Sequence, residues 1–115
     1  MNFDDAIMSH KQWKDRFLAF LKGQEKLDPA VVAKDDLCAL GRWIHHESAQ
    51  HQSLPEFSEL KARHAHFHQV AADLVIKAVG MNAAEARQMV GMGTDYSRAS
   101  ADCVNAIVTL RKRLE

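Results

Sequence analysis

Residues 55–79 read PEFSELKARHAHFHQVAADLVIKAV, and they indicate a helical fold. Its apolar residues recur at steps of three and four, which is the period of an α-helix with one buried face. Pro55 suits the first helical position, and Gly80 is expected to end the helix. His64 and His68 lie one turn apart on the apolar face, so both imidazoles should point into the core.

The same helical period continues on both sides of this stretch, and no segment has the pattern of a strand ladder. It predicts a first helix over residues 3–22, capped by Asn2, and a short helical turn at Asp28-Pro29. A second helix should run from a cap at Asp35 or Asp36 to about residue 48. A last helix should follow Asn82 to about residue 110, with Met92 on its buried face and a kink or split at residues 91–93, where two glycines weaken it.

These elements predict an all-α fold, an antiparallel four-helix bundle with one additional short helix. We expect one domain over residues 1–115, since a chain of this length can bury a single core.

Composition narrows the range of partners. Lys+Arg and Asp+Glu are both 15, so the formal net charge is zero. Nucleic acids and anionic membranes reward a basic excess, and neither is therefore the expected partner. No apolar run reaches the ~20 residues of a membrane span, and the acidic N-terminus lacks the layout of a signal peptide. We therefore expect a cytoplasmic protein, in which the two cysteines are thiols or metal ligands rather than a disulfide.

Two further residues of types that bind metals, His10 and Cys38, precede His64 and His68 in the sequence. His10 shares the buried face of the first helix with Ile7 and Trp13. Cys38 is expected in the first turn of the second helix, where the helix dipole favours a thiolate. Three imidazoles and one thiolate would suit tetrahedral zinc. The residues alone leave an alternative open, in which the histidines bond to carbonyls and Cys38 packs as a small hydrophobe.

Three motifs stand in order along the chain: His10-x-x-Trp13, Cys38-x-Leu40-Gly41-x-Trp43 and His64-x-x-x-His68. Together they resemble the chemoreceptor zinc-binding (CZB) domain family, over about residues 3–79. The resemblance implies that one Zn(II) is held by His10, Cys38, His64 and His68. It also implies that a shell of side chains packs around the site, for which we expect Trp13, Leu40, Trp43 and Phe67. Gly41, which has no Cβ, should let a neighbouring helix approach closely.

The remaining candidates are expected to lie outside the site. His66 is two positions from both members of the pair and so points about 200° away from each. His45, His46 and His51 are expected to be solvated surface residues. Cys103 lies on the apolar face of the last helix and is expected to fill core space.

A closed set of four ligands leaves no position for water or substrate, so we expect a regulatory domain rather than an enzyme. Within the resemblance, Cys38 is the redox-reactive ligand of a switch that responds to zinc or to oxidants such as hypochlorous acid in bacterial signalling. Chemotaxis and cyclic-di-GMP control are the expected settings, with a homodimer and an output domain or partner. The alternatives are a structural zinc staple in a dimerisation module and a metalloenzyme with an open site. A di-iron bundle is disfavoured because no His-x-x-x-Glu pattern occurs.

Overall fold

The computed structural model describes residues 2–36, 38–47 and 49–115. Within them the chain is all-α, with the elements α1 (Phe3–Leu21), α2 (Pro29–Val32), α3 (Ala39–Arg42), α4 (Pro55–Ala78), α5 (Ala83–Gln88) and α6 (Asp95–Leu114). A π-helix, η1 (Trp43–Glu47), continues α3, and a 3₁₀ turn, η2 (Ala49–His51), precedes α4. No described helix is long and apolar enough to cross a membrane.

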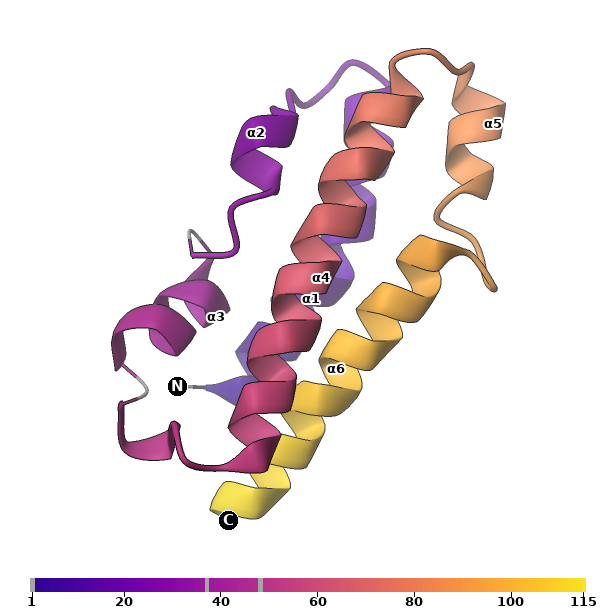
Figure 1. Cartoon of the computed structure of the whole chain (residues 1–115). Helices are drawn as coiled ribbons and strands as arrows, with labels where there is room; N and C mark the ends of the chain where they lie inside the picture. Colours follow the sequence, from indigo (N-terminus) through magenta and orange to yellow (C-terminus); the bar gives the residue numbers. More distant parts are fainter. Residues whose placement is uncertain (1, 37, 48) are drawn as a thin grey trace.

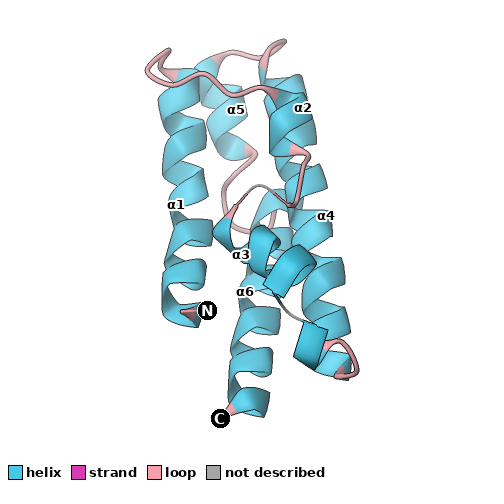
Figure 2. Ribbon diagram, turned by 90° about the vertical axis from the view of Figure 1, so that its left-hand side faces the viewer, coloured by secondary structure: helices cyan, strands magenta, loops and turns pink. Residues whose placement is uncertain are grey.

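The three long helices α1, α4 and α6 form the frame of the bundle (Figure 1). The α6 helix packs along α4 and also contacts α1, while α2 packs against α4. The chain runs up α1, down through α2 and α3, up α4 and down α6, so both termini lie at the same end (Figures 1 and 2). The all-α bundle predicted from the sequence is thus confirmed, but its second element is a series of short pieces.

Local sequence signals set the ends of these helices. The Asn2 side chain accepts a hydrogen bond from the Asp5 amide, and Asp28 does the same for Ala30 at the start of α2. Each of these bonds satisfies an amide that the first helical turn leaves free. Asn82 caps α5 through the Glu85 amide. The predicted N-caps Asn2 and Asn82 are therefore confirmed, and so is the short helical turn predicted at Asp28-Pro29.

Two boundary predictions need correction. The second helix does not begin at Asp35 or Asp36, because its N-cap is Cys38, and it changes to a π-helix after Arg42. Its predicted end at Ser48 lies outside the described residues. The last helix is split, as expected, and Gly93 takes a positive φ of 80° in the turn between α5 and α6. Met92 belongs to that turn and is 99% exposed, so its predicted place in the core was wrong.

The core runs between the long helices, and its most buried members are large side chains from all of them. Fully buried examples include Phe17 on α1, Leu60 and Phe67 on α4, and Ile107 on α6. His10 and His64 lie in the same buried region, and they are the only described polar or charged residues that are buried. Burying an imidazole is costly unless its nitrogens find partners. The packing therefore brings polar groups together inside an otherwise apolar bundle.

Candidate metal centre

Four donor atoms from three segments converge in the core. His10 comes from α1, Cys38 from the start of α3, and His64 and His68 from α4. Each residue offers one ligand atom, and the four atoms lie within 4.8 Å of one another. Within the described part of the chain they form the one group of three or more such residues placed to hold a metal ion. The structure thus brings together all four residues that the sequence singled out.

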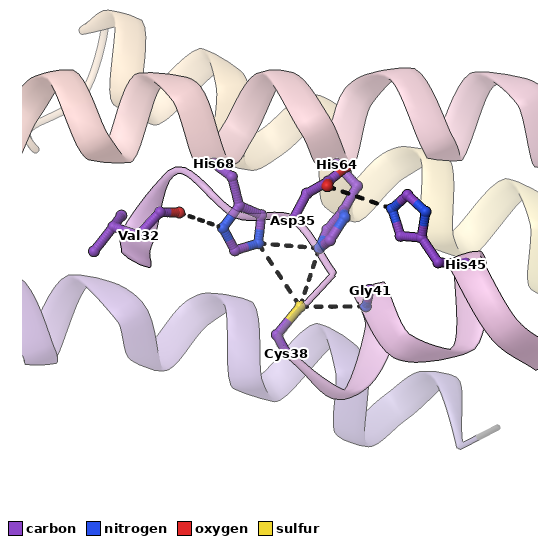
Figure 3. A network of polar contacts seen from close by, with 7 residues as sticks. All are labelled: Val32, Asp35, Cys38, Gly41, His45, His64 and His68. Atoms are coloured by element: carbon purple, nitrogen blue, oxygen red, sulfur yellow. Dashed lines mark hydrogen bonds and ion pairs between the residues drawn. The ribbon is translucent and has the colours of Figure 1, made fainter. Parts of the chain in front are cut away.

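The separations among three of the donors match a tetrahedral site (Figure 3). The Cys38 sulfur lies 3.2 Å from His64 Nε2 and 3.7 Å from His68 Nε2, and the two Nε2 atoms are 3.1 Å apart. Zinc bonds of about 2.0–2.1 Å to nitrogen and about 2.3 Å to sulfur place neighbouring ligands roughly 3.3–3.6 Å apart. Three nitrogens and one sulfur are also the donor types that zinc prefers. The residues present therefore fit a zinc ion.

A contact outside the donor cluster orients the ring of His68. His68 Nδ1 lies 2.9 Å from the carbonyl oxygen of Val32 in α2. A carbonyl only accepts, so Nδ1 carries the proton and donates it, which leaves the Nε2 lone pair directed at the cluster. A second contact of this kind is common for histidines that bind metals, because it fixes both the tautomer and the ring orientation. The short helix α2 thus has a role in the site that the sequence did not reveal.

Cys38 is held by its own helix. Its side chain caps α3, and the sulfur lies 3.3 Å from the Gly41 amide, which donates to it. Burial raises the pKa of the Cys38 thiol, and the Gly41 and Leu40 amides oppose that rise. The helix start therefore favours the thiolate as expected, but burial outweighs it when no cation is bound.

Gly41 explains how Cys38 reaches the cluster. A Cβ built on Gly41 would lie 1.8 Å from the carbonyl oxygen of Asp35 and 2.7 Å from its carbonyl carbon. The backbone just before Cys38 therefore crosses directly over Gly41. Close approach at this glycine was predicted correctly, but the neighbour is this preceding backbone and not another helix.

The side chains that were predicted to pack around the site do so only in part. Phe67 packs on the His10 ring at a centroid distance of 4.8 Å, and Trp13 packs edge-on to Phe67 at 6.1 Å. Leu40 is buried and lines a cleft together with His10 and Cys38. Trp43 instead packs edge-to-face with Phe3 and Phe57, with interplanar angles of 87° and 74°, so it anchors the start of η1 to α1 and α4.

The other histidines and the second cysteine have separate positions. His46 and His66 are exposed, as expected. His45 is exposed as well, and its Nε2 lies 3.3 Å from Asp35 Oδ1. His51 is half-buried, with its ring centroid 5.7 Å from that of Trp43, so the expected surface position is only partly met there. Cys103 is fully buried, and its sulfur lies 3.8 Å from His10 Nδ1. Helical periodicity placed Cys103 in the core but carried no signal for this contact.

Burial keeps two of the imidazoles neutral. It lowers the pKa of His10 to about 4, with a further contribution from His68. It lowers the pKa of His64 to about 2, with contributions from His68, His10 and His45. Neutral imidazole is the form that binds a metal ion, so the folded chain presents these nitrogens in their ligating state at pH 7.

The lowered pKa values predict acid sensitivity of the metal-free protein. Below pH 6.5 the unfolded chain protonates His10 and His64, whereas the folded chain does not until about pH 4 or lower. The free energy of unfolding should therefore fall between pH 6.5 and pH 4, with a limiting slope of about 1.4 kcal/mol per pH unit for each histidine. Urea unfolding of zinc-free protein at pH 7, 6 and 5 measures this fall in the free energy of unfolding.

The double variant His10→Gln/His64→Gln should flatten this pH dependence, because neither position then takes up a proton. The control is His66→Gln, which changes an exposed histidine on the same helix as His64 and should keep the wild-type slope. An unchanged slope in the double variant would refute the explanation.

The close approach at Gly41 gives a second prediction. Gly41→Ala forces the backbone before Cys38 to move, because the clash is with main-chain atoms. Zinc affinity should fall at least about tenfold, since the sulfur moves with that backbone. Chelator competition measures the affinity. Gly80→Ala is the matched control, because a Cβ there meets only the Lys77 carbonyl oxygen at 3.9 Å. Equal affinities in the two variants would contradict this role for Gly41.

The comparisons with known proteins agree with this geometry. Residues 10–75 match the family model described as the chemoreceptor zinc-binding domain, and the match spans more than half of the chain. It falls inside residues 3–79, where the sequence motifs lie. No curated protein and no solved structure matches the chain. The family is a sensory zinc-binding one and is not a known catalytic family. The match over residues 10–75 places the chain in the chemoreceptor zinc-binding (CZB) domain family, with Zn(II) as its cofactor, and the chain's cluster of three histidines and one cysteine agrees with this.

Proposed function

We propose that His10, Cys38, His64 and His68 hold one zinc ion and that the zinc-bound thiolate acts as a switch in bacterial signalling. The switch responds to zinc availability, to an oxidant such as hypochlorous acid, or to both. Chemotaxis and cyclic-di-GMP control are the settings we propose for it. In this proposal the domain works in the cytoplasm, as a homodimer, and passes its signal to an output domain or partner protein.

The main support for this proposal is a difference between the helices on which the four donor residues lie. The three histidines stand on long helices of 19 and 24 residues. Cys38 stands at the start of a four-residue helix that passes into a π-helix. Short helices gain little stability of their own, and π-helical turns are frequent at functional sites. Cys38 is therefore the donor whose release costs the fold least.

Cys38 can also be reached from the surface of the protein. It is half-buried and lines two clefts of about 270 and 250 Å³, both of which His10 lines as well. His68 is half-buried too, whereas His10 and His64 are buried, and Cys38 is the one donor of the four that carries an oxidisable sulfur. A small oxidant entering either cleft would meet the Cys38 sulfur. This supports Cys38 as the residue that senses the oxidant.

The chemistry of the thiolate links occupancy to the signal. A thiolate that attacks hypochlorous acid takes up its oxygen to give a sulfenic acid, and chloride leaves. The sulfenic acid is a poorer ligand than the thiolate, so the three histidines would remain and the start of α3 would be released. Loss of zinc releases the same segment by another route. Both signals therefore act on one sulfur and one movable element.

A structural role for zinc is the second candidate, and the burial of the site favours it. The donors link α1, the start of α3 and α4 across the core, as a staple would. In that case the domain would serve as a zinc-stapled dimerisation unit. A metalloenzyme is the weaker alternative, because four protein donors leave no open position for substrate.

Substitution of Cys38 tests the switch. Cys38→Ala should weaken zinc binding by at least about a hundredfold, because it removes one of four ligands. Hydrogen exchange followed by mass spectrometry should show faster exchange over residues 33–54 when wild-type protein is chelated or oxidised. The variant should exchange fast there under all conditions. His66→Ala is the control and should behave as wild type. Unchanged zinc affinity in Cys38→Ala would contradict the proposal.

Chelation of the wild-type protein separates the switch from the staple. In the switch, removal of zinc keeps the helix content, measured by circular dichroism, and changes exchange only around residues 33–54. In the staple, removal of zinc unfolds the whole bundle cooperatively.

A further inference from the structure

The three histidines differ in what their Nδ1 atoms contact. His68 Nδ1 donates to the Val32 carbonyl. His64 Nδ1 is buried and has no hydrogen-bond partner within the described part of the chain. His10 Nδ1 lies 3.8 Å from the sulfur of Cys103, a residue of α6 that the proposed function does not use. Both His10 and Cys103 are buried, with exposed fractions of 5% and 0%.

We propose that Cys103 is a positioning residue for zinc, in that its sulfur accepts a hydrogen bond from His10 Nδ1–H and so presents His10 Nε2 to the metal. This inference rests on the proposed zinc site. A neutral imidazole has one N–H and one lone pair, and a buried N–H needs an acceptor. Sulfur is a weak but large acceptor, so a contact near 3.8 Å suits it better than it would suit oxygen.

The placement of Cys103 argues for positioning rather than ligation. Cys103 does not belong to the group of donor atoms that lie within 4.8 Å of one another. Its sulfur lies against Nδ1, which leaves Nε2 as the nitrogen free for the cluster. In this arrangement the proton on Nδ1 fixes the tautomer, as the Val32 carbonyl does for His68.

The contact also joins the remaining long helix to the site. The α6 helix supplies none of the four donors, yet it packs against both α1 and α4. Through Cys103 the orientation of the His10 ring depends on the position of α6. Near its C-terminal end, Arg111 forms an ion pair with Asp4 in the first turn of α1. A change at the metal can therefore reach α6 through a contact 93 residues apart in the sequence.

The test compares Cys103→Ala with Ile107→Val, which trims a fully buried side chain one turn along the same helix. Zinc affinity is measured by chelator competition, after circular dichroism has shown that each variant is folded. Cys103→Ala should weaken zinc binding by about 10- to 100-fold, as loss of an outer hydrogen bond to a ligand does. Ile107→Val should bind as wild type. Cys103→Ser keeps an acceptor and should bind more tightly than Cys103→Ala. Equal affinity in Cys103→Ala and Ile107→Val overturns the proposal.

Two spectroscopic measurements distinguish positioning from core packing and from ligation. Long-range ¹H–¹⁵N spectra of zinc-loaded wild-type protein should show His10 bound through Nε2 and protonated at Nδ1, and binding through Nδ1 overturns the proposal. With Co(II) in place of zinc, the thiolate charge-transfer band should persist in Cys103→Ala, and its loss there would make Cys103 a ligand and overturn the proposal.

The Co(II) band should vanish in Cys38→Ala. If it does and Cys103→Ala binds normally, only the role of Cys103 fails. If it persists in Cys38→Ala, the proposed zinc site itself fails.

Discussion

Nitrogen and sulfur donor atoms gathered inside an apolar core constrain the whole fold. His10 and His64 are buried, and a ring nitrogen left without a partner there is costly. Burial holds these imidazoles neutral, since it lowers the pKa of His10 to about 4 and that of His64 to about 2. A cation that accepts their lone pairs turns this cost of burial into a stabilising contact. The bundle thus surrounds a place where a metal ion would satisfy donor atoms that face one another.

The way the chain supports its donors differs from one donor to the next, and this difference underlies the proposed function. The α1 and α4 helices are long and pack through large buried side chains such as Phe17 and Leu60. The segment between α2 and α4 is a series of short turns, and Cys38 lies at the beginning of one of them. In the proposed site, metal binding would couple the long, well-packed helices to a segment with little helical stability of its own. The contacts of His68 with Val32 and of His10 with Cys103 would extend this coupling to α2 and α6.

Much of this arrangement could be predicted from residue spacing. The separation of four between His64 and His68, on a strongly amphipathic stretch, is enough to place both rings on one buried face. His10 follows from the same period in α1. The position of Cys38 was harder to predict from the sequence, because the point where a helix begins depends on how the preceding backbone packs. Here the Asp35 carbonyl passes over Gly41, and the helix has Cys38 as its N-cap. The contact between His10 and Cys103 joins separate helices, and no local pattern encodes it.

One zinc ion should be bound by three imidazole nitrogens and a single sulfur, and X-ray absorption at the zinc edge of the zinc-loaded protein measures this set of ligands. We expect a first shell of three nitrogens at about 2.0–2.1 Å and one sulfur at about 2.3 Å. A shell without sulfur, or one with two sulfurs, would contradict it.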